Sequence, residues 1–177
     1  MFDLTPVENK KIDEIKYNYT ILPEYTEKEM LFMEKEMLGI YISGHPLEKI
    51  KSQIELQTTI NTYQMKKINS DIEETGMSEF EDNQFVKYAG IVTSVKKKYT
   101  KTNKLMAFIT VEDMYGPTEV IVFENCYQNC ANILVEDSII LVEGRLSVRE
   151  DEDTKIVARD IKAVSYTHLR AHETEAD

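Results

Sequence analysis

The fold of this chain is decided by the run Val86-Lys87-Tyr88-Ala89-Gly90-Ile91-Val92-Thr93-Ser94-Val95. This run alternates apolar and polar positions and is rich in β-branched residues, which is the pattern of a β-strand. Gly90 lies in its middle, where a strongly curved strand needs to bend. Two further strand-like runs follow, Leu105-Met106-Ala107-Phe108-Ile109-Thr110-Val111-Glu112-Asp113 and Glu119-Val120-Ile121-Val122-Phe123.

The elements that follow predict the architecture. Tyr115-Gly116-Pro117 forms a turn between the second and third strands, and residues 124–135 have helical spacing. Residues 138–148 and 154–163 are strand-like again. Three strands, one helix and two strands are the order of an OB-fold, the small Greek-key barrel that binds oligonucleotides. We therefore predict an α+β, mainly β, protein whose five-stranded OB-fold nucleic-acid-binding domain covers residues 84–163.

The residues before the barrel predict a linker and a helical segment. Residues 1–25 are polar and irregular, as expected of a linker. Thr26 and Glu29 have the spacing of a capping box, and Gly39 is placed to end the helix that they begin. The apolar residues of this helix predict a buried stripe made of Met30, Leu31, Met33, Met37 and Leu38.

The helical segment is predicted to extend over residues 26–70. Its second helix runs from residue 46 to 57, because Pro46 suits a first helical turn, and its inner face holds Leu47, Ile50 and Ile54. A short third helix follows at residues 58–68. Residues 71–83 are rich in Asp and Glu and predict an acidic linker to the barrel.

Composition narrows the class of protein. The 177 residues carry 21 Lys and Arg against 32 Asp and Glu, a formal charge of −11, which argues against a protein that wraps nucleic acid with its whole surface. No run approaches the ~18 apolar residues of a membrane span, so we expect no membrane partner. Two cysteines suggest no disulfide framework and favour a cytoplasmic protein. Cys126 and Cys130 share one face of the predicted helix and are expected to be free, half-buried thiols rather than metal ligands.

The basic residues gather in one stretch, which predicts a nucleic-acid contact. This stretch is expected to form the loop between the first two strands, which lines the groove of an OB-fold. Its ammonium groups would follow a phosphate backbone, and Tyr99 and Phe108 would stack on bases. The alternative is a solvated hairpin tip. The residues concerned are Lys96, Lys97, Lys98, Tyr99, Lys101 and Lys104.

The second groove loop, at residues 149–153, is expected to weaken phosphate binding. It holds four consecutive carboxylates after Arg149, so affinity should be modest and sensitive to salt. Arg145 and Arg149 are expected to contribute on one side of the groove. Tyr115 is a second stacking candidate, whereas Phe123, at the end of an apolar strand, is expected in the core.

No catalytic residues and no metal or cofactor site are predicted in this chain. Two-metal phosphoryl transfer needs a set of carboxylates held between rigid strands. The adjacent Glu112 and Asp113 do not form such a set, because neighbouring strand residues point to opposite faces. His45 has no partner for acid–base chemistry, and we predict that it caps the second helix.

The run Glu34-Lys35-Glu36-Met37-Leu38-Gly39-Ile40-Tyr41-Ile42-Ser43-Gly44-His45-Pro46-Leu47 resembles a signature of the bacterial replicative DNA polymerase III alpha subunit. In that family a similar run lies just before an OB domain. The resemblance implies that the chain is a fragment of a template-directed DNA polymerase, a nucleotidyltransferase that uses magnesium. It also implies that the catalytic residues lie elsewhere in the parent, that this part binds single-stranded template DNA, and that other replisome subunits are its partners.

The two ends of the chain carry separate expectations. The family has a clamp-binding peptide upstream of the signature, and Met1, Phe2 and Leu4 resemble the end of one, which makes the sliding clamp a partner. The alternative is an arbitrary start with a stray Phe. Residues 164–177 neither continue the strand pattern nor resemble the family. They match one reading frame of a common sequencing adapter, so we expect a non-native tail.

Two other classes of function remain open from the sequence. One is an OB-type tRNA- or RNA-binding domain, which leaves the signature at residues 34–47 unexplained. The other is a protein–protein adaptor with an inactive groove, which the net charge and the acidic loop favour.

Overall fold

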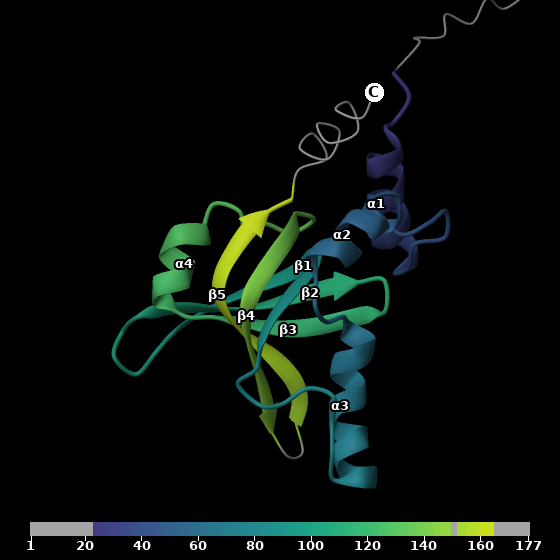
Figure 1. Ribbon diagram of the computed structural model, residues 1–177. Helices are drawn as coiled ribbons and strands as arrows, with labels where there is room; N and C mark the ends of the chain where they lie inside the picture. The colour runs from purple at the N-terminus through teal and green to yellow at the C-terminus, as the bar shows by residue number, and fades with distance from the viewer. Residues whose placement is uncertain (1–22, 150–151, 165–177) are drawn as a thin grey trace, which may run out of the picture.

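Five strands close into a barrel in the computed structural model, which describes residues 23–149 and 152–164 (Figure 1). The strand order around the barrel is β1-β2-β3-β5-β4, and only the contact between β3 and β5 is parallel. The predicted five-stranded OB-type barrel is therefore confirmed. The strands are β1 (Phe85–Tyr99), β2 (Leu105–Asp113), β3 (Gly116–Val122), β4 (Ile139–Arg149) and β5 (Glu152–Ala163).

The first strand bends at Gly90, as predicted. Residues 85–91 of β1 pair with β4, and residues 91–99 pair with β2, so the strand changes partners at Ile91. A Cβ atom on residue 90 would lie 2.7 Å from the carbonyl oxygen of Glu112. The bend brings two backbones closer than any side chain allows, and this close approach requires glycine.

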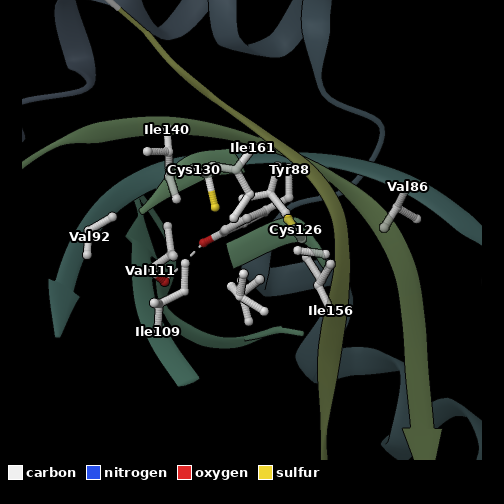
Figure 2. Packing of buried hydrophobic residues seen from close by; sticks show 14 of the residues in the cluster. Val86, Tyr88, Val92, Ile109, Val111, Cys126, Cys130, Ile140, Ile156 and Ile161 are labelled. Carbon is white, nitrogen blue, oxygen red and sulfur yellow. Dashed lines mark hydrogen bonds between the residues drawn. The ribbon is translucent and has the colours of Figure 1, made fainter. Parts of the chain in front are cut away.

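Alternate residues of the strands fill the barrel, and Figure 2 shows their side chains converging on its axis. Tyr88 is the largest fully buried side chain, and β-branched residues such as Ile109, Val111, Ile140 and Ile156 are fully buried beside it. Helix α4 (Glu124–Cys130) packs against β2 and β5 and sends the sulfurs of Cys126 and Cys130 into this core. Both cysteines are free, as predicted, and both are buried. The helix ends at Cys130, five residues earlier than predicted.

Between residue 23 and the barrel, the structure has three helices and one 3₁₀ turn. They are α1 (Glu27–Leu38), η1 (Glu48–Ile50), α2 (Lys51–Gln57) and α3 (Thr62–Thr75). The capping box between Thr26 and Glu29 is formed, and Gly39 ends α1 in the left-handed conformation with φ of 76°. The predicted second helix is divided between η1 and α2, and its inner residues Leu47 and Ile50 are buried. No helix within the described residues is long and apolar enough to cross a membrane.

The predicted buried stripe of α1 is wrong. Leu31 is buried, but Met30, Met37 and Leu38 are 48%, 83% and 57% exposed. Apolar periodicity predicts which residues of a helix share a face, but burial of that face also requires an element that packs on it. Within the described residues, no element covers this face.

Helix α3 belongs to the barrel rather than to a separate segment. Ile60, Met65 and Ile68 lie in the same hydrophobic cluster as the inward-facing strand residues. The helix continues to Thr75 and is capped by Gly76, so the predicted acidic linker does not begin at residue 71. Phe80 is also buried in the barrel cluster. Residues 60–80 therefore cover an end of the barrel instead of connecting two units.

Of the predicted clamp-binding peptide and the predicted non-native tail, only residue 164 lies within the described residues. Val164 is the first residue of the predicted non-native tail. Its N–H donates to the carbonyl of Ile139 at 2.9 Å, and its side chain packs on the hydrophobic cluster that contains Ile139. Residue 164 therefore belongs to the barrel. The rest of that tail and the candidate clamp-binding residues Met1, Phe2 and Leu4 lie outside the described residues.

Candidate nucleic-acid interface

The lysine-rich stretch does not form a single loop. Strand β1 extends through Tyr99, so Lys96, Lys97 and Lys98 lie in the strand and point alternately to opposite sides. The Nζ atom of Lys98 lies 5.0 Å from the ring centroid of Phe108, whereas that of Lys97 lies on the α4 side, 5.9 Å from the ring centroid of Tyr127. The predicted cluster of ammonium groups is thus divided between two faces.

The tip of the β1–β2 hairpin is a short turn at residues 100–104, and one of its two lysines is neutralised. Lys104 forms an ion pair with Glu124 at the start of α4, with a distance of 2.8 Å between Nζ and Oε2. Lys101 and Tyr99 are exposed, and Lys101 forms no ion pair with a described residue. Lys96, Lys98 and Lys101 therefore remain available to an anionic ligand on the groove side or at the tip.

One row of side chains crosses all five strands on the outer surface of the barrel. Direct cross-strand partners follow one another from β1 to β4: Lys96 with Phe108, Phe108 with Ile121, Ile121 with Val157, and Val157 with Arg145. Each residue is exposed or half-buried, and on β2, β3, β4 and β5 its neighbours along the strand are buried. Direct partners have Cβ atoms about 5 Å apart, so the five side chains form a continuous surface. We call this row the belt.

The belt has an apolar centre between two cationic ends. Phe108, Ile121 and Val157 offer a half-buried surface on which planar rings can stack. Lys96 and Arg145, both exposed, place positive charge at the two ends of this surface. An aromatic platform flanked by cations is the arrangement that binds single-stranded nucleic acid without reading its sequence.

A groove of about 780 Å³ adjoins the Arg145 end of the belt. Arg145, Arg149 and Arg159 line it, and none of the three forms an ion pair with a described carboxylate. Phe123 also lines it and is 48% exposed, so its predicted place in the core is wrong. The inward position belongs to Val122, and Phe123 instead serves as the N-cap residue of α4.

Arg159 is a candidate that the sequence argument missed. Strand alternation was the available signal: Ile156 and Ala158 are apolar and inward, which makes Val157 and Arg159 outward. Lys155, on the same strand, is less available. It forms ion pairs with Glu119 at 3.2 Å and Glu152 at 3.4 Å, and the hydrogen bond to Glu119 raises the pKa of the ammonium group.

The structure does not bring Tyr115 to the belt. Tyr115 lies in the β2–β3 turn, where its ring centroid is 6.4 Å from that of Tyr63 on α3. The distance along β2 from Phe108 to Tyr115 is seven residues, or about 23 Å. Arg145 lies in the belt, and both Arg145 and Arg149 line the adjoining groove. A ligand contact for any of these residues stays a prediction.

The paired carboxylates and the histidine have structural partners. Glu112 forms an ion pair with Lys35 of α1 at 3.1 Å, while Asp113 points to the opposite face and accepts the N–H of Thr62 at 2.7 Å. His45 accepts the N–H of Leu47 at Nδ1, at 3.2 Å, within the turn before η1. The predicted cap is wrong, because Leu47 is itself the N-cap residue of η1 and neither η1 nor α2 has a side-chain cap. Burial lowers the pKa of its imidazole. Among the described residues, no group of three His, Cys, Asp or Glu side chains could hold a metal ion.

The signature at residues 34–47 folds back on α1. The carboxylate of Glu34 accepts the N–H groups of Ile42 and Ser43 at 3.1 and 3.0 Å and also accepts the Ser43 hydroxyl. The Ser43 hydroxyl bond is the main reason why the pKa of Glu34 is lowered. Gly44 has φ of 137°, which favours glycine. The signature therefore forms a closed loop that Lys35 ties to the barrel.

Comparisons with known proteins match the barrel and also the residues before it. Residues 86–164 match the tRNA anti-codon family, described as an OB-fold nucleic acid binding domain. Among solved structures, a mitochondrial single-stranded DNA binding protein from S. cerevisiae aligns with 48% of this chain and 98% of its own. Its TM-score is 0.39 and its identity 13%, a likeness too weak to carry an argument.

Longer matches are bacterial proteins named DNA polymerase III subunit alpha. The protein from Borreliella burgdorferi is 35% identical over 144 residues, which are 81% of this chain and 12% of the relative. The one from Bacillus subtilis is 28% identical over 148 residues, again 80% of this chain and 12% of the relative. The chain thus spans about a tenth of the length of these relatives. The resemblance carried by residues 34–47 is confirmed: the chain is a relative of one segment of the bacterial DNA polymerase III alpha subunit, a segment that includes an OB-fold domain.

Proposed function

We propose that the belt and the adjoining groove bind single-stranded DNA, and that this DNA is the template strand of a replicative polymerase. The observation that carries the proposal is the register that places Lys96, Phe108, Ile121, Val157 and Arg145 side by side across five strands. Bases would stack on the apolar centre, and the two cationic ends would contact phosphates. The names of the relatives support DNA as the ligand.

The expected binding is modest and depends strongly on salt. Stacking contributes about 1–3 kcal/mol per base, and the belt offers one aromatic platform. Three groove-side cations, Lys96, Lys98 and Arg145, would give a slope of about −2 in a plot of log K against log salt concentration. The chain's net charge of −11 lowers affinity further through long-range repulsion.

Fluorescence anisotropy of labelled oligo-dT at several salt concentrations tests the proposal. We expect Arg145→Glu to weaken binding about tenfold and to make the salt slope shallower by about 0.7. Phe108→Ala should weaken binding about tenfold and leave the slope unchanged, because it removes stacking and no charge. The matched control is Lys67→Glu, which makes the same charge change on α3, where Lys67 pairs with Asp71.

Equal effects of Arg145→Glu and Lys67→Glu would refute a specific contact at the belt. The same measurements with oligo-rU distinguish a second candidate, RNA binding, which the anti-codon family match favours. Tighter binding of oligo-rU than of oligo-dT would assign the groove to RNA, because the 2′-hydroxyl is the group that differs. If neither oligomer binds, the proposal of nucleic-acid binding is refuted, and a role as a protein–protein adaptor is the remaining class of function.

For the longer protein, we propose template-directed DNA synthesis with magnesium, carried out by residues outside this chain. The support is the name shared by the relatives and the extent of the match. We also propose that other replisome subunits are partners; the candidate clamp peptide lies outside the described residues. Sequencing the DNA upstream of residue 1 tests this proposal. A reading frame without polymerase motifs would overturn it.

A further inference from the structure

A cavity of about 270 Å³ lies where the pre-barrel helices meet the barrel, away from the belt. Liquid water occupies about 30 Å³ per molecule, so this volume corresponds to roughly nine waters, close to the size of one heterocyclic base. Much of its lining is apolar, including Leu47, Ile54 and Met114. Tyr115, which is 51% exposed, borders the cavity and lies beside Tyr63. A planar ring that enters would meet apolar surface and a tyrosine able to stack.

The buried acceptor of the cavity, Asp113, is already occupied, whereas the exposed Glu55 lies at the edge and pairs with Lys51 at 3.8 Å. Asp113 accepts the N–H of Thr62 through Oδ2, and it accepts the N–H groups of Tyr115 and Gly116 through Oδ1 at 2.8 and 3.1 Å. Three charge-assisted bonds satisfy this carboxylate. It therefore has little capacity left for a donor group of a ligand.

Besides the exposed ammonium group of Lys51, which pairs with Glu55, the donors of the cavity are the amide NH₂ groups of Asn61 and Gln64. These two residues form the capping box of α3: Oδ1 of Asn61 accepts the N–H of Gln64 at 2.9 Å, and Oε1 of Gln64 accepts the N–H of Asn61 at 3.1 Å. Both oxygens are used, which orients the amides. Neither NH₂ group donates to a described residue, and both side chains line the cavity.

We propose that this cavity binds a single nucleobase that presents carbonyl oxygens, such as thymine or uracil. The two amide groups donate to the ring carbonyls, the apolar lining contacts one face of the ring, and Tyr115 stacks at the opening. Adenine is disfavoured, because its exocyclic amino group needs an acceptor that Asp113 no longer offers. The choice of a nucleobase as ligand rests on the proposed function of the belt. The site itself is separate from the belt.

Methionine methyl NMR tests the two sites independently, because each has its own reporter. Met114 lines the cavity, and Met106 lies in β2 opposite Lys98, next to the belt. With ¹³C-methyl methionine, thymidine should shift the Met114 signal in a saturable way. Adenosine at the same concentration should give a much smaller shift. Oligo-dT should shift the Met106 signal if the belt binds DNA.

Gln64→Glu is the sharpest variant for the cavity. A glutamate at this position keeps the acceptor of the capping box and loses the NH₂ donors. We expect the thymidine-dependent shift of Met114 to be lost. Gln57→Glu makes the same chemical change at an exposed position of α2 that does not line the cavity, and there we expect no effect. The amide-to-carboxylate change adds one negative charge in both variants, and thymidine carries no phosphate, so the charge alone does not explain a difference.

Two results would overturn the nucleobase site. One is a Met114 signal that thymidine does not move at saturating concentration. The other is a thymidine shift that persists in Gln64→Glu or that adenosine reproduces in full. If oligo-dT leaves Met106 unmoved while thymidine moves Met114, the proposed function of the belt fails and the cavity site stands.

Discussion

Replacing Asp113 by alanine should destabilise the protein strongly, because this one carboxylate joins α3 to the end of β2. The side chain is 7% exposed and accepts three backbone N–H groups. The N–H of Thr62 is buried and would lose its bond to the Asp113 carboxylate, at a cost of about 1–3 kcal/mol. The N–H groups of Tyr115 and Gly116 are partly buried, so water can replace part of each bond, and we assign about 0.5–1 kcal/mol to each. The expected total is about 3 kcal/mol.

Urea unfolding followed by circular dichroism measures this loss. With an m-value of about 2 kcal/mol/M, a loss of about 3 kcal/mol lowers the midpoint by roughly 1.5 M. The neighbouring Glu112→Ala is the matched control. It removes a carboxylate whose partner is the partly exposed Lys35, so we expect a loss of about 1 kcal/mol or less. A loss below about 1 kcal/mol for Asp113→Ala, or equal losses for the two variants, would refute the role that we assign to the Asp113 hydrogen bonds.

Three further predictions concern single residues. Burial lowers the pKa of His45 below its ordinary value of 6.5, so the unfolded chain binds more protons than the folded chain between the two pKa values. We therefore expect the contribution of His45 to the free energy of unfolding to be complete above pH 6.5 and to be lost as the pH falls through the folded pKa. A His45→Gln variant should lack this pH dependence. Gly144→Ala would place a Cβ atom 2.3 Å from the backbone oxygen of Val157, so we expect a loss of about 2 kcal/mol and a Tm lower by roughly 7 °C in calorimetry; an unchanged Tm would contradict it. Tyr88→Phe removes a buried hydroxyl that bonds to Thr62 Oγ1 at 3.0 Å and should cost about 1 kcal/mol in urea unfolding, whereas a more stable variant would show that the hydroxyl is not needed.

The barrel was predictable from the sequence because its signals are local. Each strand alternates apolar and polar residues, and Gly90 falls where the backbone must approach another strand. The capping box at Thr26 and the left-handed Gly39 also follow from neighbouring residues alone. Strand number, order and most element types therefore agree between prediction and structure.

The composition of the candidate site was harder to predict because it depends on register. Whether Lys97 faces the groove or α4 depends on where β1 ends, and lysine-rich sequence gave no sign that the strand continues through Tyr99. Tyr115 and Phe108 are close in sequence, but Phe108 lies within β2 and Tyr115 lies in the turn after it. The belt itself joins residues from strands up to 60 positions apart, and only the closed topology brings Lys96 and Arg145 into one row.

The end of β2 connects the signature loop, the third helix and the belt. Glu112 and Asp113 are adjacent and point to opposite faces; the first holds Lys35 of α1, and the second holds the first turn of α3. The belt residue Phe108 lies four residues earlier on the same strand. Because a paired strand is stiff over that length, the Lys35–Glu112 ion pair relates α1 to the groove through β2. Helix α3 is held more firmly, because the Asp113 hydrogen bond acts together with the burial of its apolar residues in the barrel core. The contact of α1 with the end of β2 is therefore polar, and the exposed apolar face of this helix takes no part in it.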